Sequence, residues 1–390
     1  MSARVDRSPV TPPIVFTLAG LALFVAVPSL RDHRGDPEIL LRIAETGLVL
    51  LLFTDASRTD LAILRSIRNL PARLLTVGML LTLFLGALLA LPIFPGLSLW
   101  EAGILSAILA PTDAGLGQVV VTSEKVPAAV RQALNVEAGL NDGLSVPFLL
   151  FFLVLARAGA SGGAAHLSTF VVEQLGYGTA IGLGIGLVGG WALGGASRRG
   201  AILPSFRQIA VVVLPVGCAL VSDATGASMF IAAFVCGLAV QVGFPEAGKD
   251  CLEFTDEWGQ VLNLFVFFLF GILLGRLGPE FTWADAAYAV ASLTVVRMLP
   301  VAIALAGARR SRATVLFMGW FGPRGLASIV LALVYLEAPG GTPGERTILG
   351  AVAATVALSI FAHGLSARPG IALLAKRPPT PGSGVQGKKE

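Results

Sequence analysis

Charged side chains are scarce in this chain. Only 13% of its 390 residues are Asp, Glu, Lys or Arg, whereas 55% are hydrophobic, and the mean hydropathy is +0.81. A typical soluble domain carries about 25% charged residues. The composition therefore excludes an ordinary soluble domain and predicts an all-α polytopic membrane protein. The net charge of +4 is too small to indicate binding to nucleic acid.

Cysteine and histidine are also rare, with three of each. The cysteines are odd in number and share no metal-ligand spacing, so they support neither a disulfide framework nor a metal site. The histidines are far apart in sequence, so a histidine zinc centre is poorly supported, and we expect each of them in a loop or in packing. We also expect no bound cofactor. The residues are Cys218, Cys236, Cys251, His33, His166 and His363.

Long apolar runs dominate the chain instead. A helix needs about 20 mainly apolar residues to cross a membrane, and the sequence holds twelve such runs. They lie near 11–29, 38–56, 74–95, 98–122, 128–157, 168–196, 204–221, 225–243, 258–278, 284–306, 313–336 and 347–366. The first run follows Arg4 and Arg7, as in a signal peptide, but no A-x-A-like cleavage site comes after it. We therefore expect it to be retained as a span.

Basic residues are concentrated in alternate connections between these runs. Twenty of the 28 Lys and Arg residues lie in the two termini and in every second connection. The remaining connections hold only Arg31, Arg34, Arg157, Arg276 and Arg346. The positive-inside rule then predicts both termini in the cytoplasm. We expect a multi-pass protein of the inner (plasma) membrane. Residues 1–378 are expected to form one transmembrane domain, and the basic, Pro/Gly-rich residues 379–390 a disordered cytoplasmic tail.

A polar stripe interrupts the fifth apolar run, in the sequence LNVEAGLNDGLSVP. An ionisable group near the bilayer centre costs roughly 2.5 to 3.5 kcal/mol on insertion scales unless a partner or a water-filled cavity compensates it. On a helix, Glu137 and Asn141 share one face, Asn135 and Asp142 lie on one line, and Ser145 follows one turn beyond Asp142. An ionisable Asp exceeds what helix-to-helix hydrogen bonding requires, which indicates a functional site.

Two other runs contain helix breakers at mid-depth. The fourth run reads APTDAGLG around Pro111, and the eleventh reads FGPRGLAS around Pro323. Proline removes a backbone donor and glycine eases unwinding, so both runs are predicted to be broken helices. The breaks lie seven runs apart, so the two helices cross in opposite directions, as in an inverted repeat. Arg324, in the second break, needs an anionic partner or exposed carbonyl ends.

Further polar residues within the runs give weaker signals. Arg42 and Glu45 are spaced to pair with each other, and Asp55 is placed to line the cytoplasmic entrance. Asp223 is expected to cap the N-terminus of the eighth run. Arg297, deep in the tenth run, is either a structural anchor or a charge that sets the local field.

Several motifs together resemble those of a known family. They are LAPTDA, EAGLNDG, GWFGPRGLAS, TPPIVFTLAGLALF, GASMFIAAFVCGLAV and VRMLPV. The chain resembles monovalent cation:proton antiporters of the NhaP and sodium/hydrogen exchanger type over nearly its whole length. The resemblance implies a homodimer with 13 helices per chain, in which a six-helix core domain with two crossed, unwound helices moves like an elevator against a dimer-forming domain.

The resemblance also concerns the boundaries of these domains. Core-domain motifs are expected at 98–157 and 204–336, with dimer-interface helices elsewhere. The twelve runs are one fewer than the family's 13 helices, and the missing one would precede Thr11. With an odd number of spans the N-terminus would lie outside.

Carried over residue by residue, the resemblance implies roles for four residues of the two central motifs. Asp142 would bind the monovalent cation and the proton in turn. Asn141 stands where electrogenic relatives have Asp, which implies electroneutral exchange of one cation for one proton. Thr112 would contribute to the ion site, and Asp113 would face the opposing helix ends.

A charged pair and one departure complete the comparison. Glu137 and Arg324 match a pair expected to form a salt bridge in the core, whereas Arg297, Asp55 and Ser145 are possible accessory residues. Ala138 stands where family members often have Ser, which implies that one hydroxyl ligand is either missing or replaced by backbone or water.

The predicted function is therefore secondary active antiport of a monovalent cation (Na⁺, with Li⁺ and K⁺ as alternatives) for H⁺, serving pH homeostasis. Removal from water favours the protonated form of Asp142 and a nearby cation favours the ionised form, so the two exclude each other. Its partners are the cation, the proton, the lipid bilayer and a second copy of the chain. A passive cation channel lined by Asp113 and Asp142 is the alternative, but the sequence has no filter motif. A membrane-embedded hydrolase or acyltransferase is disfavoured because no His accompanies the deep carboxylates, so we expect no enzyme.

Overall fold

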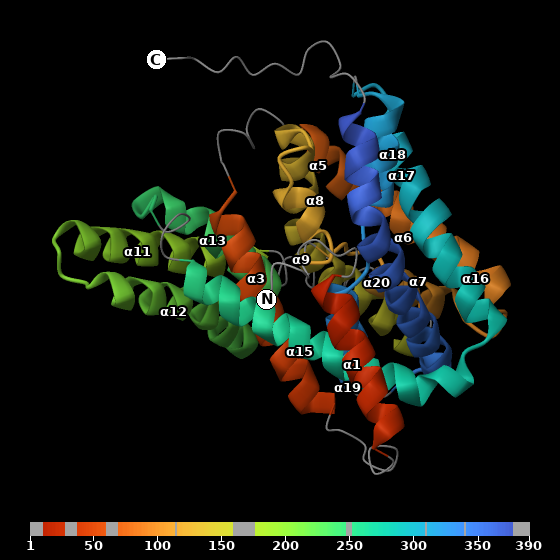
Figure 1. The fold of residues 1–390 in the computed structure, drawn as a ribbon. Coiled ribbons are helices and arrows are strands. Elements are labelled where there is room, and N and C mark those ends of the chain that lie inside the picture. The colour runs from red at the N-terminus through yellow and green to blue at the C-terminus, as the bar shows by residue number, and fades with distance from the viewer. Residues whose placement is uncertain are drawn as a thin grey trace.

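The computed structural model describes most of the chain (Figure 1). The described residues are 11–27, 37–59, 69–113, 115–158, 176–246, 252–308, 310–338 and 341–376. All regular structure within these ranges is helical. The tail expected at 379–390 lies outside them.

The helices follow the apolar runs closely. They are α1 (Pro12–Ala26), α3 (Pro37–Ser57), α5 (Asn69–Arg73), η1 (Leu74–Gly78), α6 (Met79–Ile93), α7 (Leu99–Ile108), α8 (Gln118–Thr122), α9 (Ala128–Ala158), α11 (Gly178–Arg198), α12 (Pro204–Thr225), α13 (Met229–Gly243), α15 (Glu253–Leu277), η3 (Gly278–Glu280), α16 (Trp283–Ala291), η4 (Ser292–Val296), α17 (Arg297–Ala304), α18 (Arg312–Trp320), α19 (Leu326–Glu337) and α20 (Glu345–Ala375). Each predicted run overlaps one of these helices or a consecutive set. In the described ranges, seven helical stretches are long and apolar enough to cross a membrane, and four shorter apolar helices accompany them. The number of crossings stays a prediction.

Both predicted helix breaks are present. The fourth run is divided between α7, which ends at Ile108, and α8, which begins at Gln118. The eleventh run is divided between α18, which ends at Trp320, and α19, which begins at Leu326. We call residues 109–113 and 115–117 the first break and residues 321–325 the second break. Extended backbone at this depth has unpaired amide and carbonyl groups, which must find partners within the protein.

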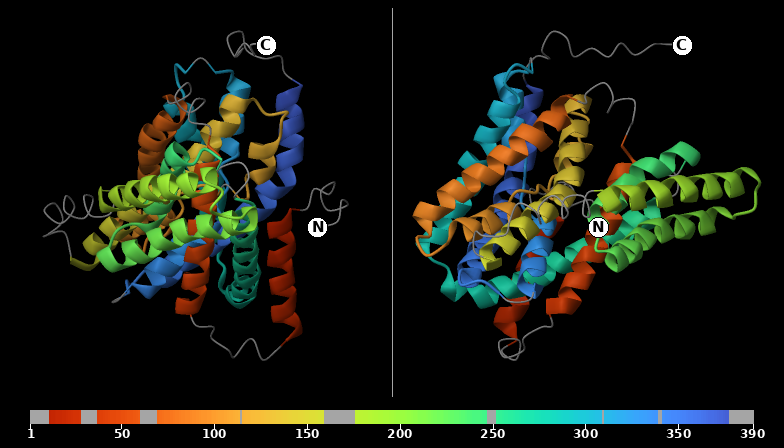
Figure 2. Two further views of the ribbon diagram at one scale, coloured as in Figure 1. Left: turned by 90° about the vertical axis from the view of Figure 1, so that its left-hand side faces the viewer. Right: turned by 180° about the vertical axis from the view of Figure 1, so that it is seen from behind.

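The helices pack in two groups (Figures 1 and 2). In the first helix group, α11 lies along α13, α1 lies along α15, α3 contacts both α13 and α15, and α12 contacts α11 and α13. The second helix group contains both breaks and comprises α5 to α9 and α16 to α20, with η1 and η4. Contacts of α3 with α9 and α19 join the two groups. The sequence placed 204–336 with the core motifs, but α12, α13 and α15 of that stretch pack in the first helix group.

Small residues allow the closest contact within the first helix group. Gly182, Gly186, Gly190 and Gly194 recur every fourth residue on one face of α11, and all are buried against α13. A Cβ on Gly186 would collide with the backbone of α13. Without a hydrophobic driving force inside a bilayer, such close backbone packing stabilises helix pairs.

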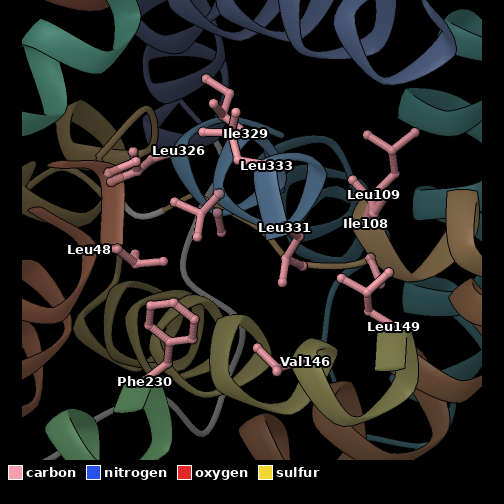
Figure 3. Packing of buried hydrophobic residues seen from close by; sticks show 14 of the residues in the cluster. Leu48, Ile108, Leu109, Val146, Leu149, Phe230, Leu326, Ile329, Leu331 and Leu333 are labelled. Atoms are coloured by element: carbon pink, nitrogen blue, oxygen red, sulfur yellow. The ribbon is translucent and has the colours of Figure 1, made fainter. Parts of the chain in front are cut away.

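Apolar side chains surround the breaks in the second helix group (Figure 3). Leu326 and Leu331 of α19 pack in one cluster with Ile108 of α7 and Val146 and Leu149 of α9. These residues are at most 7% exposed. The dispersion contacts of this cluster hold the two broken helices beside α9.

Candidate functional site

Arg324 satisfies the backbone at one end of the first break. Its guanidinium Nη1 donates to the carbonyl oxygens of Ala110 (2.5 Å) and Pro111 (2.8 Å), just beyond the C-terminal end of α7. These carbonyls lie just past the C-terminal end of α7, where a cation is favoured by the helix dipole. The side chain is fully buried. Of the two partners expected for Arg324, an anion or carbonyl ends, it therefore has the carbonyl ends.

Asp113 does the reverse for the second break. Its Oδ2 accepts a hydrogen bond from Leu326 N (2.5 Å), at the N-terminal end of α19, and its Oδ1 accepts from Gly115 N (2.7 Å) and Leu116 N (3.1 Å). A carboxylate stabilises the partial positive charge of a helix N-terminus. A Cβ on Gly325 would collide with Asp113 Oδ2, so this approach requires glycine at that position. Asp113 thus faces the opposing helix end, as expected.

The predicted salt bridge between Glu137 and Arg324 is wrong. Glu137 pairs instead with Arg297 of α17, in a bidentate ion pair with Oε1–Nη1 and Oε2–Nη2 distances of 2.5 and 2.9 Å. Both side chains are buried. Arg324 is directed to the carbonyls of the first break, so its Nη1 donors are used there. Arg297, for which the sequence left two roles open, is therefore the ion-pair partner of Glu137.

Asn141 ties α9 to the first break. Its Oδ1 accepts from Thr112 N (3.1 Å), and its Nδ2 donates to Thr112 Oγ1 (2.9 Å). Ser145, one turn further along α9, donates from Oγ to Asn141 O (2.7 Å) and is fully buried. Both ends of the Asn141 amide are therefore occupied by Thr112, which makes Asn141 a positioning residue.

Asp142 is the deep carboxylate that lacks such partners. The residue is 5% exposed, and its Oδ1 has no hydrogen-bond partner in the described part of the chain. It lines a cavity of about 640 Å³, which Asn135 and Asp113 also line. The shared position of Asn135 and Asp142 agrees with their predicted alignment along α9. A buried oxygen without a partner costs free energy unless water or an ion satisfies it.

Both helix groups contribute walls to this cavity. From the second helix group come α8 and α9, with Gln118, Arg131 and Asn135 among the lining residues. From the first come α3 and α15, with Asp55 and Asp256. Asp55 therefore lines the same cavity as Asp142, and its place at a cytoplasmic entrance stays a prediction. The cavity thus lies between two groups of helices, and the carboxylates of Asp142, Asp113 and Asp55 are among its lining groups.

The chain matches one family over almost its whole length. The family, described as "Sodium/hydrogen exchanger, transmembrane", matches residues 1–372. The chain belongs to this family. It is therefore a multi-pass membrane protein, and the two breaks, which contact each other through Asp113 and Arg324, are part of an exchanger-family fold.

Named relatives and a solved structure agree with this assignment. The chain is 27% identical to the Na⁺/H⁺ antiporter NhaP of Pseudomonas aeruginosa, over 92% of this chain and 90% of that one. It is 25% identical to the K⁺/H⁺ antiporter NhaP of Alkalimonas amylolytica, over 90% of this chain but 61% of that one. Its fold is similar to that of the sodium proton antiporter MjNhaP1 from Methanocaldococcus jannaschii, with a TM-score of 0.75, 20% identity, and coverage of 94% of this chain and 92% of that one.

Ser359 and His363 are site residues that the sequence did not reveal in this exchanger-family chain. Arg324 N donates to Ser359 Oγ (2.7 Å), and Ser359 Oγ lies 3.0 Å from His363 Nδ1. His363 Nε2 lies 2.9 Å from Trp320 O, and its Nδ1 also lies 3.1 Å from Ser359 O, so each ring nitrogen faces a backbone carbonyl. Through these contacts, α20 binds Trp320 at one end of the second break and Arg324 at the other. The only sequence signal was the four-residue spacing of Ser359 and His363.

Two peripheral predictions have different outcomes. Arg42 and Glu45 do pair, at 3.6 Å, and Arg42 also lies 3.7 Å from Asp223. Asp223 does not cap the eighth run, because α12 continues to Thr225 and Ser228 is the N-cap of α13. That prediction is wrong because α12 continues to Thr225, beyond the end of its predicted apolar run at residue 221.

Proposed function

We propose that this exchanger-family chain is a secondary active antiporter that exchanges a monovalent cation for H⁺. The observation that carries the proposal is Asp142, a buried carboxylate that lines a cavity and has one oxygen without a hydrogen-bond partner among the described residues. The relatives named as Na⁺/H⁺ and K⁺/H⁺ antiporters support the same reaction class. On this proposal the chain is a transporter rather than an enzyme.

Coupling follows from competition at one carboxylate. A site poor in water favours the neutral carboxyl, whereas a cation beside it favours the carboxylate, so Asp142 holds a proton or a cation but not both. Exchange then requires one more condition. With a proton or cation bound, the site must switch between access to one side of the membrane and access to the other more readily than it does when it is empty and charged. Thr112 supports the cation site through the first break, and Asp113 keeps that break in place.

Electroneutral exchange is supported by the bonding partners of the polar residues near Asp142. Asn141 does not ionise, and its amide is occupied by Thr112. Asp113 accepts three backbone hydrogen bonds, and Glu137 is paired with Arg297. These charges are compensated within the protein, which leaves Asp142 as the deep carboxylate free to alternate. One carboxylate carries either one monovalent cation or one proton.

Alternation is proposed to occur between the two helix groups, with the second moving against the first in an elevator-like motion. The cavity has walls from both groups, so a relative displacement would close it on one side of Asp142. The first helix group would then carry the dimer contact of a homodimer. We propose the inner membrane as the location, with the cavity mouth and the C-terminus on the cytoplasmic side.

The test is exchange by the purified chain in proteoliposomes that contain a pH-sensitive dye. NaCl, LiCl or KCl is added outside in turn with the membrane potential clamped, and the wild type is compared with Asp142→Asn. We expect one or more salts to drive proton movement, and Asp142→Asn to abolish it while the protein stays folded. Salts that support movement identify the cation.

Matched controls make each outcome informative. Asn135→Ala changes a polar residue that lines the same cavity on the same helix and should retain exchange. Cation flux without proton movement would favour a passive channel. Full exchange by Asp142→Asn would contradict the proposal.

A further inference from the structure

One face of α15 lines the same cavity as α9. Glu257, Gln260 and Asn263 recur on this face, and their burial increases along the helix. Glu257 is exposed, Gln260 is half-buried, and Asn263 is 5% exposed. This polar face belongs to the first helix group, whereas Asp142 belongs to the second. Asn263 is therefore a buried polar side chain that faces the site from the other group.

Asn263 has an unused acceptor. Its Oδ1 is buried and has no hydrogen-bond partner within the described ranges. The same is true of Asp142 Oδ1, and both residues line the one cavity. Gln132 Oε1 and Thr11 Oγ1 also lack partners among the described residues and belong to lining residues of this cavity. Of these oxygens, Asp142 Oδ1 carries a carboxylate charge and Asn263 Oδ1 a carboxamide dipole, and both are ligand types that hard cations prefer.

Asn263 also lies beside the first break. A Cβ built on Gly115 would be 2.9 Å from Asn263 Nδ2 and 3.0 Å from Asp113 Oδ1. The Asn263 amide and the Asp113 carboxylate thus both lie next to the Cα of Gly115, and the lack of a side chain at Gly115 leaves room for them. The carbonyl oxygen of the same amide is the atom that has no partner among the described residues.

We infer that Asn263 Oδ1 is a cation ligand that the first helix group contributes to the site. The inference rests on the proposed antiport and deepens it. Asp142 moves with the second helix group, so the Asn263 ligand is present only while the site is open to this cavity. The cation would then bind more tightly on the cavity side than on the opposite side, and Asn263 would help to select among alkali cations.

A neutral ligand at this position has a particular consequence. Because the amide oxygen does not take up a proton, it contributes to cation binding without adding a second proton to the exchange. Removing it weakens cation binding but leaves the coupling ratio unchanged. A residue that merely held the first break in place would instead affect the maximal rate.

The experiment compares Asn263→Leu with the wild type in the proteoliposome assay, using Na⁺, Li⁺ and K⁺ separately. Leu keeps the volume and removes the oxygen. We expect the half-saturating cation concentration to rise about 3- to 10-fold, as for the loss of one neutral polar contact. The order among the three cations should also change, with the maximal rate within about twofold of the wild type.

Two further variants distinguish a ligand from a structural support. Gln260→Leu removes an amide one turn away on the same face, and Gln260 Nε2 already donates to Asp256 Oδ1 (3.0 Å), so its half-saturating concentration should stay within about twofold. Asn263→Asp keeps an oxygen at the position and should bind the cation even if Asn263→Leu fails to fold.

Failure of this inference is separable from failure of the proposed antiport. If Asp142→Asn abolishes exchange but Asn263→Leu lowers only the maximal rate, with an unchanged half-saturating concentration and cation order, the ligand role is overturned and the antiport stands. If Asp142→Asn exchanges normally, the antiport itself fails.

Discussion

The three deep carboxylates differ in their hydrogen-bond and ion-pair partners; they are Asp113, Glu137 and Asp142. Glu137 has a bidentate arginine, and Asp113 has three backbone amides, whereas Asp142 has an oxygen without a partner. A charge without compensation is costly in a membrane, so residues of this kind mark functional positions. Burial alone does not separate the three, because all are at most 6% exposed. Their bonding partners distinguish Asp142 from the other two.

The pairing of Glu137 with Arg297 gives a residue-scale prediction. Removing one partner leaves the other buried and unpaired, so Arg297→Met should lower the free energy of unfolding by roughly 3 to 5 kcal/mol. Thermal unfolding of the purified protein in detergent measures the loss. Adding Glu137→Gln to Arg297→Met should recover part of it, because no buried charge then remains.

A double-mutant cycle identifies the true partner. We expect a coupling energy between Glu137 and Arg297 well above that between Glu137 and Arg324. Larger coupling with Arg324 would support the pairing inferred from the sequence and contradict the observed geometry.

Asn141 gives a second residue-scale prediction. In Asn141→Asp the Thr112 hydroxyl can donate to the new carboxylate, so the link between α9 and the first break is preserved. A second ionisable group then accompanies Asp142, and exchange should become sensitive to the membrane potential. The measurement is proton movement in proteoliposomes at two clamped potentials, with the wild type expected to be insensitive. Equal sensitivity of both proteins would show that Asn141 does not set the charge balance.

At the scale of helices, α11 and α13 are held together by small residues. Gly186→Leu should separate them, because a Cβ there meets the backbone of α13, and overpacking of this kind costs about 1 to 3 kcal/mol. Gly184→Leu is the matched control, since a Cβ at Gly184 meets nothing within 4 Å. We expect a lower unfolding temperature for the first variant and no change for the second. Equal effects would mean that this face of α11 is not tightly packed.

The helices and breaks were predictable because their signals are local. Apolar length set the runs, and Pro111 and Pro323 with nearby glycines set the two breaks. The partner of Glu137 was not predictable, because two buried arginines were available and the choice depends on how α17 packs against α9. Arg324 bonds to backbone carbonyls, which every residue has, so no sequence pattern distinguishes them.

For the whole molecule, the arrangement of the site depends on two helix groups that meet at one cavity. The sequence located Asp142 and Asp55 but did not indicate that Asn263, 121 positions after Asp142, lies in the same cavity. Contacts between α15 and the breaks arise only when the first and second helix groups assemble. Ser359 and His363 were missed for the same reason, since their role depends on α20 lying beside the second break.

The central claim is that one carboxylate, Asp142, exchanges a proton for a monovalent cation. The most direct measurement is proton release from purified protein in weakly buffered detergent solution when NaCl, LiCl or KCl is added, with choline chloride as the ionic-strength control. The account predicts release of about one proton per bound cation at a pH where the site is protonated, and none from Asp142→Asn. Cation binding without proton release, or undiminished release from Asp142→Asn, would contradict it.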